Sequence, residues 1–145
     1  MNFRYNNYKN FGIGEKVVSI YEVEVKNKDQ AIKLGKILNE NKIMYKISGM
    51  FYVLVICEEY SQISVLGEIL KEFGLNKGQE KLAVMYEIVG SKKHLNELKK
   101  LLHENGIFKI YNPFYQSVKV FCGTSFQIKK LESILNELDH RINAE

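Results

Sequence analysis

The chain has 145 residues, enough for one domain or for two small ones that share a core. Hydrophobic residues make up 46% and charged residues 26% of the chain, an ordinary globular composition that excludes collagen-like and broadly disordered proteins. The 21 basic and 17 acidic residues give a net charge of +4. Only Arg4 and Arg141 are arginines, and because arginine dominates contacts to phosphate and guanine, nucleic acid is the less expected partner.

The N-terminal segment, residues 1–16, interleaves aromatic side chains with asparagine and basic residues. Its aromatic residues are Phe3, Tyr5, Tyr8 and Phe11. We expect them to cover an apolar sheet face; stacking on single-stranded nucleic acid is the alternative. The segment has no apolar core of a signal peptide, and no apolar run in the chain approaches the ~18 residues of a membrane span. These patterns predict a cytoplasmic protein without membrane contact.

Residues 17–74 carry a βαββα series of signals, read from alternating or helically spaced apolar residues. The expected elements are a strand over 17–25, a helix over 29–41 with Asp29 as N-cap, strands over 43–48 and 50–57 around the Ser48-Gly49 turn, and a helix that begins at Ser61 and ends at Gly74. Residues 81–138 repeat the series. The second set is a strand over 82–89, a helix after Ser91, strands over 107–111 and 115–122, and a helix from Ser125 to Leu138.

The two series match as a duplication at an offset of 64 or 65 residues. Leu38-Asn39-Glu40-Asn41-Lys42-Ile43 matches Leu102-His103-Glu104-Asn105-Gly106-Ile107, and Val53, Val55 and Cys57 match Val118, Val120 and Cys122. Each half resembles the ferredoxin-like α/β plait without its last strand. The first strand of either half can fill the missing place in the other. We therefore predict an α+β fold with one six-stranded antiparallel sheet, strand order 2-3-1-1′-3′-2′, and four helices on one face. A C-terminal tail would span 139–145.

One passage resembles a known family more closely. The run Leu98-Lys99-Lys100-Leu101-Leu102-His103-Glu104-Asn105-Gly106-Ile107 resembles the helix-to-strand passage of ACT-type ligand-sensing domains. The Pro-Gly that those domains often carry in the first strand–helix loop is replaced by Asn27-Lys28-Asp29 and by Gly90-Ser91-Lys92. The resemblance implies a plait fold and a regulatory, ligand-sensing role, without specifying an amino acid as the ligand.

Strand parity predicts which side chains face the helices and which lie on the opposite, helix-free face of the sheet. The helix-free face would carry Glu22 and Tyr52 in the first half and Glu87 and Phe121 in the second. We predict these four as ligand-binding residues, the two glutamates near the pseudo-twofold axis. Because this face is too apolar to be left in water, we also predict a homodimer.

Motifs for catalysis or metal binding are missing from the sequence. It contains no nucleophile elbow, no Walker A loop, no HExxH and no paired Cys or His spacing typical of zinc sites. We therefore expect no catalytic residues, no metal and no cofactor, and a protein that is more a binding module than an enzyme. The leading hypothesis is a regulatory module for a small molecule or a protein. The alternatives are nucleic-acid binding through the sheet face and a mobile-element-encoded inhibitor or adaptor of another macromolecule.

Overall fold

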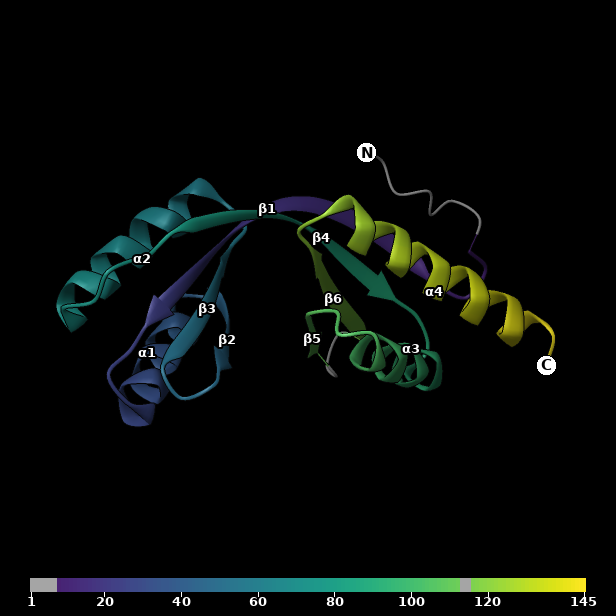
Figure 1. The fold of residues 1–145 in the computed structure, drawn as a ribbon, viewed down its shortest axis with the longest axis horizontal. Coiled ribbons are helices and arrows are strands. Elements are labelled where there is room, and N and C mark those ends of the chain that lie inside the picture. The colour runs from purple at the N-terminus through teal and green to yellow at the C-terminus, as the bar shows by residue number, and fades with distance from the viewer. Residues whose placement is uncertain (1–7, 113–115) are drawn as a thin grey trace. The chain divides into compact units, whose positions relative to one another are not determined.

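The computed structural model of the protein describes residues 8–112 and 116–145, and it consists of strands and helices in two βαββα series (Figure 1). The elements are β1 (Gly12–Glu24), α1 (Lys28–Glu40), β2 (Met44–Ser48), β3 (Tyr52–Cys57), α2 (Tyr60–Phe73), β4 (Glu80–Val89), α3 (Lys92–Glu104), β5 (Lys109–Asn112), β6 (Ser117–Cys122) and α4 (Ser125–Asn143). Within the described ranges, no helix is long and apolar enough to cross a membrane.

The strands form one six-stranded antiparallel sheet in the order β2-β3-β1-β4-β6-β5. This order is the predicted 2-3-1-1′-3′-2′, so the α+β class and the topology are confirmed. The registers repeat between the halves. Tyr21 lies opposite Val55 in the β1–β3 pair, and Tyr86 lies opposite Val120 in the β4–β6 pair.

The chain divides into two compact units. The first unit comprises residues 17–82, and the second comprises residues 83–145 together with the segment that ends at Lys16. Each unit has a core in which two helices pack on one face of its strands. The first core contains Tyr21, Val23, Val53, Val55 and Cys57, and the second contains Tyr86, Ile88, Val118, Val120 and Cys122. These are the residues that strand parity assigned to the helix side of the sheet.

Several element ends differ from the sequence prediction, for reasons of local hydrogen bonding. Asn27, not Asp29, is the N-cap of α1, and its side chain accepts a hydrogen bond of 2.8 Å from the backbone N–H of Gln30. The N-cap of α2 is Glu59, ahead of the predicted Ser61. The backbone N–H of Glu59 donates to the side-chain oxygen of Gln62 at 3.2 Å, which fixes the first turn of α2.

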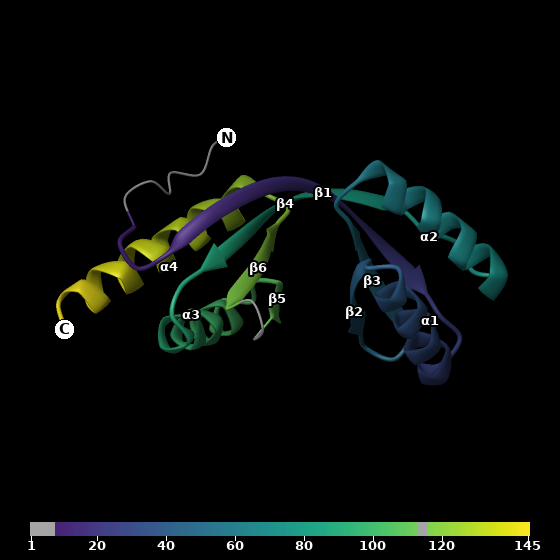
Figure 2. The ribbon, with the colours of Figure 1, turned by 180° about the vertical axis from the view of Figure 1, so that it is seen from behind.

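The described part of the N-terminal segment packs on the helix side of the second unit. Phe11 is buried in the second core and Tyr8 packs against that core. Asp139 of α4 accepts hydrogen bonds from the backbone N–H of Asn10 and of Lys9. Figure 2 shows the start of β1 beside α4. The expectation that Tyr8 and Phe11 cover the helix-free sheet face is therefore wrong, because both side chains join the helix-side core; Phe3 and Tyr5 lie outside the described residues.

The last helix also extends beyond its expected end. It continues from Ser125 to Asn143, through residues for which the sequence predicted a tail. Asp139 and Ile142 are both buried, and Ile142 belongs to the second core. The extra turn of helix thus supplies the anchor to which the N-terminal segment is attached.

Candidate functional site

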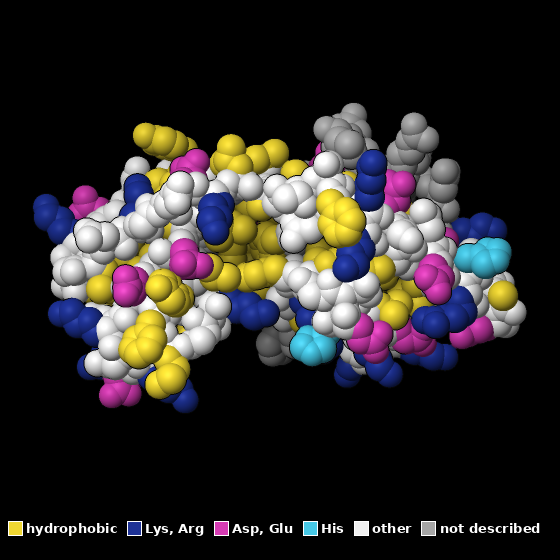
Figure 3. Space-filling model, viewed as in Figure 1, with side chains coloured by type: hydrophobic (Ala, Val, Ile, Leu, Met, Phe, Trp, Pro, Cys, Tyr) yellow, Lys and Arg dark blue, Asp and Glu magenta, His cyan; other side chains and the backbone are white. Residues whose placement is uncertain are grey.

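The first unit contains a hollow of about 690 Å³ at the end of β1. It is lined from three segments: the end of β1, the β2–β3 turn, and the loop between α2 and β4. The lining residues are Glu22, Glu24, Val25, Lys26, Phe51, Tyr52, Gly74, Leu75, Asn76 and Gly78. In Figure 3 acidic and hydrophobic side chains lie next to each other at the surface of this unit. Hollows of this volume are within the range that small-molecule ligands occupy.

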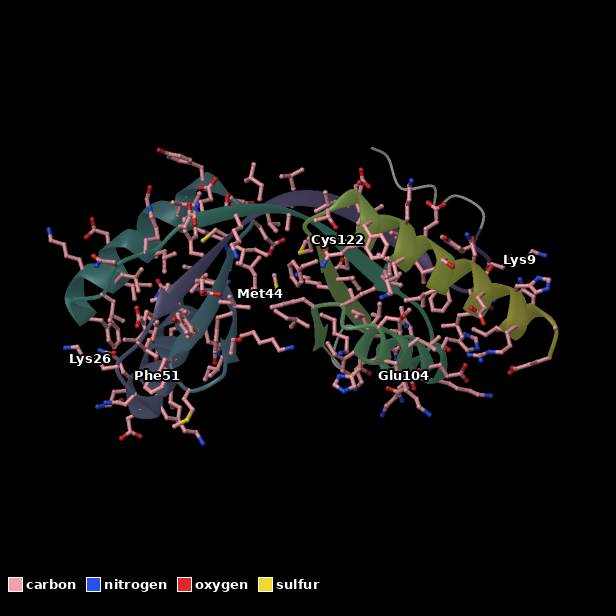
Figure 4. The ribbon with its side chains drawn as sticks, in the orientation of Figure 1. Lys9, Lys26, Met44, Phe51, Glu104 and Cys122 are labelled. Atoms are coloured by element: carbon pink, nitrogen blue, oxygen red, sulfur yellow. The ribbon has the colours of Figure 1, made fainter. Side chains whose placement is uncertain are left out.

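The pairing of β1 with β3 sets the positions of the polar and aromatic side chains. Glu22 lies opposite Leu54 and Glu24 lies opposite Tyr52. One step further, the backbone N–H of Val25 donates to the carbonyl of Phe51 at 2.7 Å, which ties the end of β1 to the β2–β3 turn. Because side chains two residues apart share one face of a strand, Glu22 and Glu24 point to the same side as Tyr52. Figure 4 labels Lys26, which follows β1, and Phe51, which lies in the β2–β3 turn.

The loop after α2 forms the third wall, and its close approach depends on Gly78. This residue has φ +78°, and a Cβ atom placed there would lie 2.5 Å from the carbonyl oxygen of Glu22. Only glycine accommodates both the positive φ and the short distance to the backbone. The wall of the hollow therefore rests directly on the strand that carries Glu22 and Glu24.

Contacts on the helix side of β1 hold the same loop in place. The Tyr21 hydroxyl donates a hydrogen bond of 2.6 Å to the Glu80 carboxylate, and the Lys77 ammonium lies 5.2 Å from the centre of the Tyr21 ring. Burial, followed by the hydrogen bond to Glu80, raises the pKa of Tyr21 to about 12. The phenol stays protonated at neutral pH and keeps donating to Glu80. Tyr21 thus positions the loop without facing the hollow.

The hollow carries an excess of negative charge. In the described part of the chain, neither Glu22 nor Glu24 forms an ion pair. Lys26 is the one cationic side chain among the lining residues, so two carboxylates against one ammonium leave a formal charge of −1. Tyr52 is 39% exposed and Phe51 is also exposed, so both rings are accessible to a ligand.

Of the four predicted ligand-binding residues, the structure brings Glu22 and Tyr52 together in the hollow. Glu87 and Phe121 belong to the second unit. Glu87 lies opposite Lys119, and their charged groups are 3.8 Å apart. The Phe121 ring is 4% exposed and meets the ring of Phe108 edge to face, with centroids 5.1 Å apart.

The sequence interpretation missed several residues of the hollow. Glu24 has the same parity as Glu22, so strand alternation placed it on the correct face, but nothing in the sequence separated it from an ordinary solvated charge. Phe51 was expected inside a strand that begins at residue 50, whereas the strand begins at Tyr52 and leaves Phe51 in the turn. The loop that contains Gly78 gave no sequence signal, because the position of an irregular segment depends on tertiary contacts.

The two cysteines do not line the hollow. Within the described ranges, no cluster of three His, Cys, Asp or Glu side chains could hold a metal ion. Cys57 and Cys122 are buried and free. Burial raises the pKa of each thiol to about 11, so both remain protonated at neutral pH.

We expect both cysteines to react slowly in the folded protein, since the thiolate is the reactive form. Alkylation by iodoacetamide at pH 8, followed by mass spectrometry, should be at least about tenfold slower than in urea-unfolded protein. The urea-unfolded sample is the control for reagent activity. Equal rates in the two samples would contradict the burial of the thiols.

No protein-family model matches the chain, and no curated protein sequence does. Solved structures do match its fold. A putative C-terminal regulatory domain of aspartate kinase from Porphyromonas gingivalis W83 aligns with a TM-score of 0.53 and 16% identity, over 88% of this chain and 95% of that one. The ligand-free regulatory subunit of aspartate kinase from Thermus thermophilus aligns with a TM-score of 0.51 and 11% identity, over 90% and 97%.

The aspartate kinase of Clostridium acetobutylicum aligns with a TM-score of 0.52 and 17% identity over 92% of this chain. The alignment covers only 35% of that enzyme, so the chain corresponds in length to about a third of it. At these identities the similarity concerns the fold. The chain has the fold of aspartate kinase regulatory domains, and the predicted resemblance to ACT-type ligand-sensing domains is confirmed at the level of fold.

Proposed function

We propose that this protein is a non-catalytic regulatory module that binds a small molecule in the hollow of the first unit. One observation carries the proposal: a hollow of about 690 Å³ that places two carboxylates, neither ion-paired with any residue the structure describes, beside two accessible aromatic rings. Such a combination of polar and apolar groups is typical of ligand sites. The hollow lies within residues 17–82, so a single unit supplies every group that lines it.

The similar solved structures support the regulatory part of the proposal. Two of them carry the description of a regulatory domain or a regulatory subunit, and they match this chain over nearly their whole length. Fold alone does not define a function, and the hollow itself is what supports ligand binding. A homodimer and a cytoplasmic location remain predictions from the sequence.

Native mass spectrometry of protein purified without denaturation tests the proposal. We expect a discrete added mass, or an added mass that appears after incubation with a metabolite mixture, and we expect a homodimer. Replacing Tyr52 by alanine should abolish the added mass. Tyr60→Ala is the matched control, because Tyr60 is 83% exposed in the same unit and does not line the hollow.

Two outcomes of the mass spectrometry would contradict the proposal. If the Tyr52→Ala and Tyr60→Ala variants retain the same added mass, the ligand binds outside the hollow. If neither purified nor metabolite-treated protein ever carries an added mass, small-molecule binding itself is wrong.

A further inference from the structure

The duplication allows equivalent positions of the two units to be compared, and their charges differ. In the β4–β6 pair Glu87 lies opposite Lys119, and the two form an ion pair of 3.8 Å. In the β1–β3 pair the equivalent Glu22 lies opposite Leu54. The position directly opposite the carboxylate thus holds a cation in the second unit and an apolar side chain in the first.

The residues two positions further along β1 and β4, on the same sheet face, also differ in charge. Val89 of β4 lies opposite Ser117, whereas Glu24 of β1 lies opposite Tyr52. Relative to the second unit, the first has gained a carboxylate and an aromatic ring. Its lysine in this row is Lys46, one strand further from the carboxylate, where the second unit has Ile110. Glu22, Glu24 and Tyr52 share one sheet face and line the hollow, whereas Leu54 and Lys46 do not line it.

The spacing of these groups suits a cation with an apolar body. Glu22 and Glu24 are two residues apart on one strand, so their Cα atoms are separated by roughly 7 Å. The Cβ atoms of the Glu24–Tyr52 pair are about 5 Å apart, as in any directly opposed pair. An ammonium group between the carboxylates would lie beside the Tyr52 ring, whose face attracts cations. The apolar part of the molecule would contact Phe51 and Leu75, which line the same hollow.

We propose that the ligand of this hollow is a small organic cation, a protonated amine attached to an apolar or aromatic body. This inference rests on the proposed function and adds the chemical class of the ligand. Glu22 and Glu24 bind the ammonium group, and Tyr52 and Phe51 contact the body. Lys26 offsets part of the negative charge, and the remaining charge of −1 matches a monocation.

Three probes of one skeleton and different charge test the ligand class: 2-phenylethylamine, 2-phenylethanol and phenylacetate. Each is titrated into the isotopically labelled full chain, and backbone amide shifts are followed by NMR. We expect 2-phenylethylamine to shift the amides of residues 22–26, 51–52 and 74–78, and to bind at least about tenfold more tightly than the alcohol. Phenylacetate should bind more weakly than the alcohol. Raising the salt concentration should weaken binding of the amine only.

Charge-neutralising variants assign the effect to the two carboxylates. The Glu24→Gln and Glu22→Gln variants should each weaken 2-phenylethylamine binding about tenfold while leaving the affinity for 2-phenylethanol unchanged. Glu87→Gln is the matched control, because it removes the same charge at the equivalent place in the second unit and should leave the amine affinity as it was. Amide spectra of each variant confirm that the fold is kept.

The outcomes separate this inference from the proposed function. If the alcohol or phenylacetate shifts the same amides with equal or greater affinity, or if Glu87→Gln weakens the amine as much as Glu24→Gln does, the cationic class is wrong and the hollow remains a ligand site. If none of the three probes shifts these amides, the cationic class is wrong as well, and native mass spectrometry then decides whether the hollow binds any molecule.

Discussion

Replacing Asp139 by alanine should lower the free energy of unfolding by about 3 kcal/mol and release the N-terminal segment from α4. Asp139 is 6% exposed, and its carboxylate accepts hydrogen bonds from the backbone N–H of Asn10 at 2.9 Å and from that of Lys9 at 3.2 Å. The Asn10 side chain donates a further bond of 2.8 Å. Without the carboxylate these donors lose their partner in a partly buried place, and the burial of Phe11 beside them is weakened.

The same contacts give the stability a pH dependence. Burial alone would raise the pKa of Asp139, but the hydrogen bonds from Asn10 and Lys9 and the Lys9 charge outweigh it and lower the pKa below the usual 3.8. A carboxyl group with a lowered pKa in the folded state stabilises the protein above its unfolded-state pKa. This stabilisation is lost as the pH falls through the folded-state pKa. The difference between wild type and variant should therefore be full at pH 7 and shrink below about pH 4.

Urea unfolding followed by circular dichroism, together with hydrogen exchange of the Lys9 and Asn10 amides, measures both effects. Asp139→Asn keeps one acceptor oxygen and should lose less stability than the alanine variant. Glu137→Ala on the exposed side of α4 is the matched control and should change the free energy of unfolding by less than about 0.5 kcal/mol. Unchanged protection of both amides in Asp139→Ala would show that the carboxylate does not hold the segment.

The sheet topology was predictable from the sequence because the duplication restricts it. Each βαββα series lacks the last strand of the plait. The first strand of the other series can take that place in both halves. Alternation within the strands also assigned the faces, since Tyr21 and Tyr86 can reach the helix side only in one register. The ends of the elements were less predictable. Asn27 and Asp29 both suit an N-cap, and the choice depends on which side chain reaches the free backbone N–H groups of α1.

The position of the N-terminal segment depends on a tertiary contact that no local pattern reports. Asp139 reads in the sequence as one acidic residue among several near the end of a helix. Its role follows only from the approach of Asn10, which lies 129 residues earlier in the chain. For the same reason Phe11 was expected on the helix-free face, while the structure places it in the second core.

Strand alternation predicted only part of the candidate site. Glu22 and Tyr52 were predicted from alternation, and the structure puts both in one hollow. The choice between Glu22 and its equivalent Glu87 needed the strand register, because the residue opposite each carboxylate decides whether its charge is balanced. The third wall needed the path of the α2–β4 loop, which is fixed by the close contact of Gly78 with β1.

Replacing Gly78 by alanine should lower the free energy of unfolding by about 3 kcal/mol, the upper end of the cost of a strained backbone position. The added Cβ meets the Glu22 carbonyl oxygen at 2.5 Å, and φ +78° is unfavourable for alanine. Because the obstacle is the backbone of a strand, the loop must move away from β1. Urea unfolding measures the loss of stability, and NMR shifts along residues 22–26 and 74–78 report the movement.

The Gly106→Ala variant separates the cost of the positive φ from the cost of the steric contact. Gly106 has φ +67°, and a Cβ atom there would have no neighbour within 4 Å, so this variant carries the backbone strain without the steric contact. We expect it to cost about 1 kcal/mol and to leave binding of 2-phenylethylamine unchanged. Gly78→Ala should in addition weaken that binding, since its displaced loop is a wall of the hollow. Equal losses of stability in the two variants would mean that the loop yields to the methyl group without resistance, and the hollow would then have no fixed third wall.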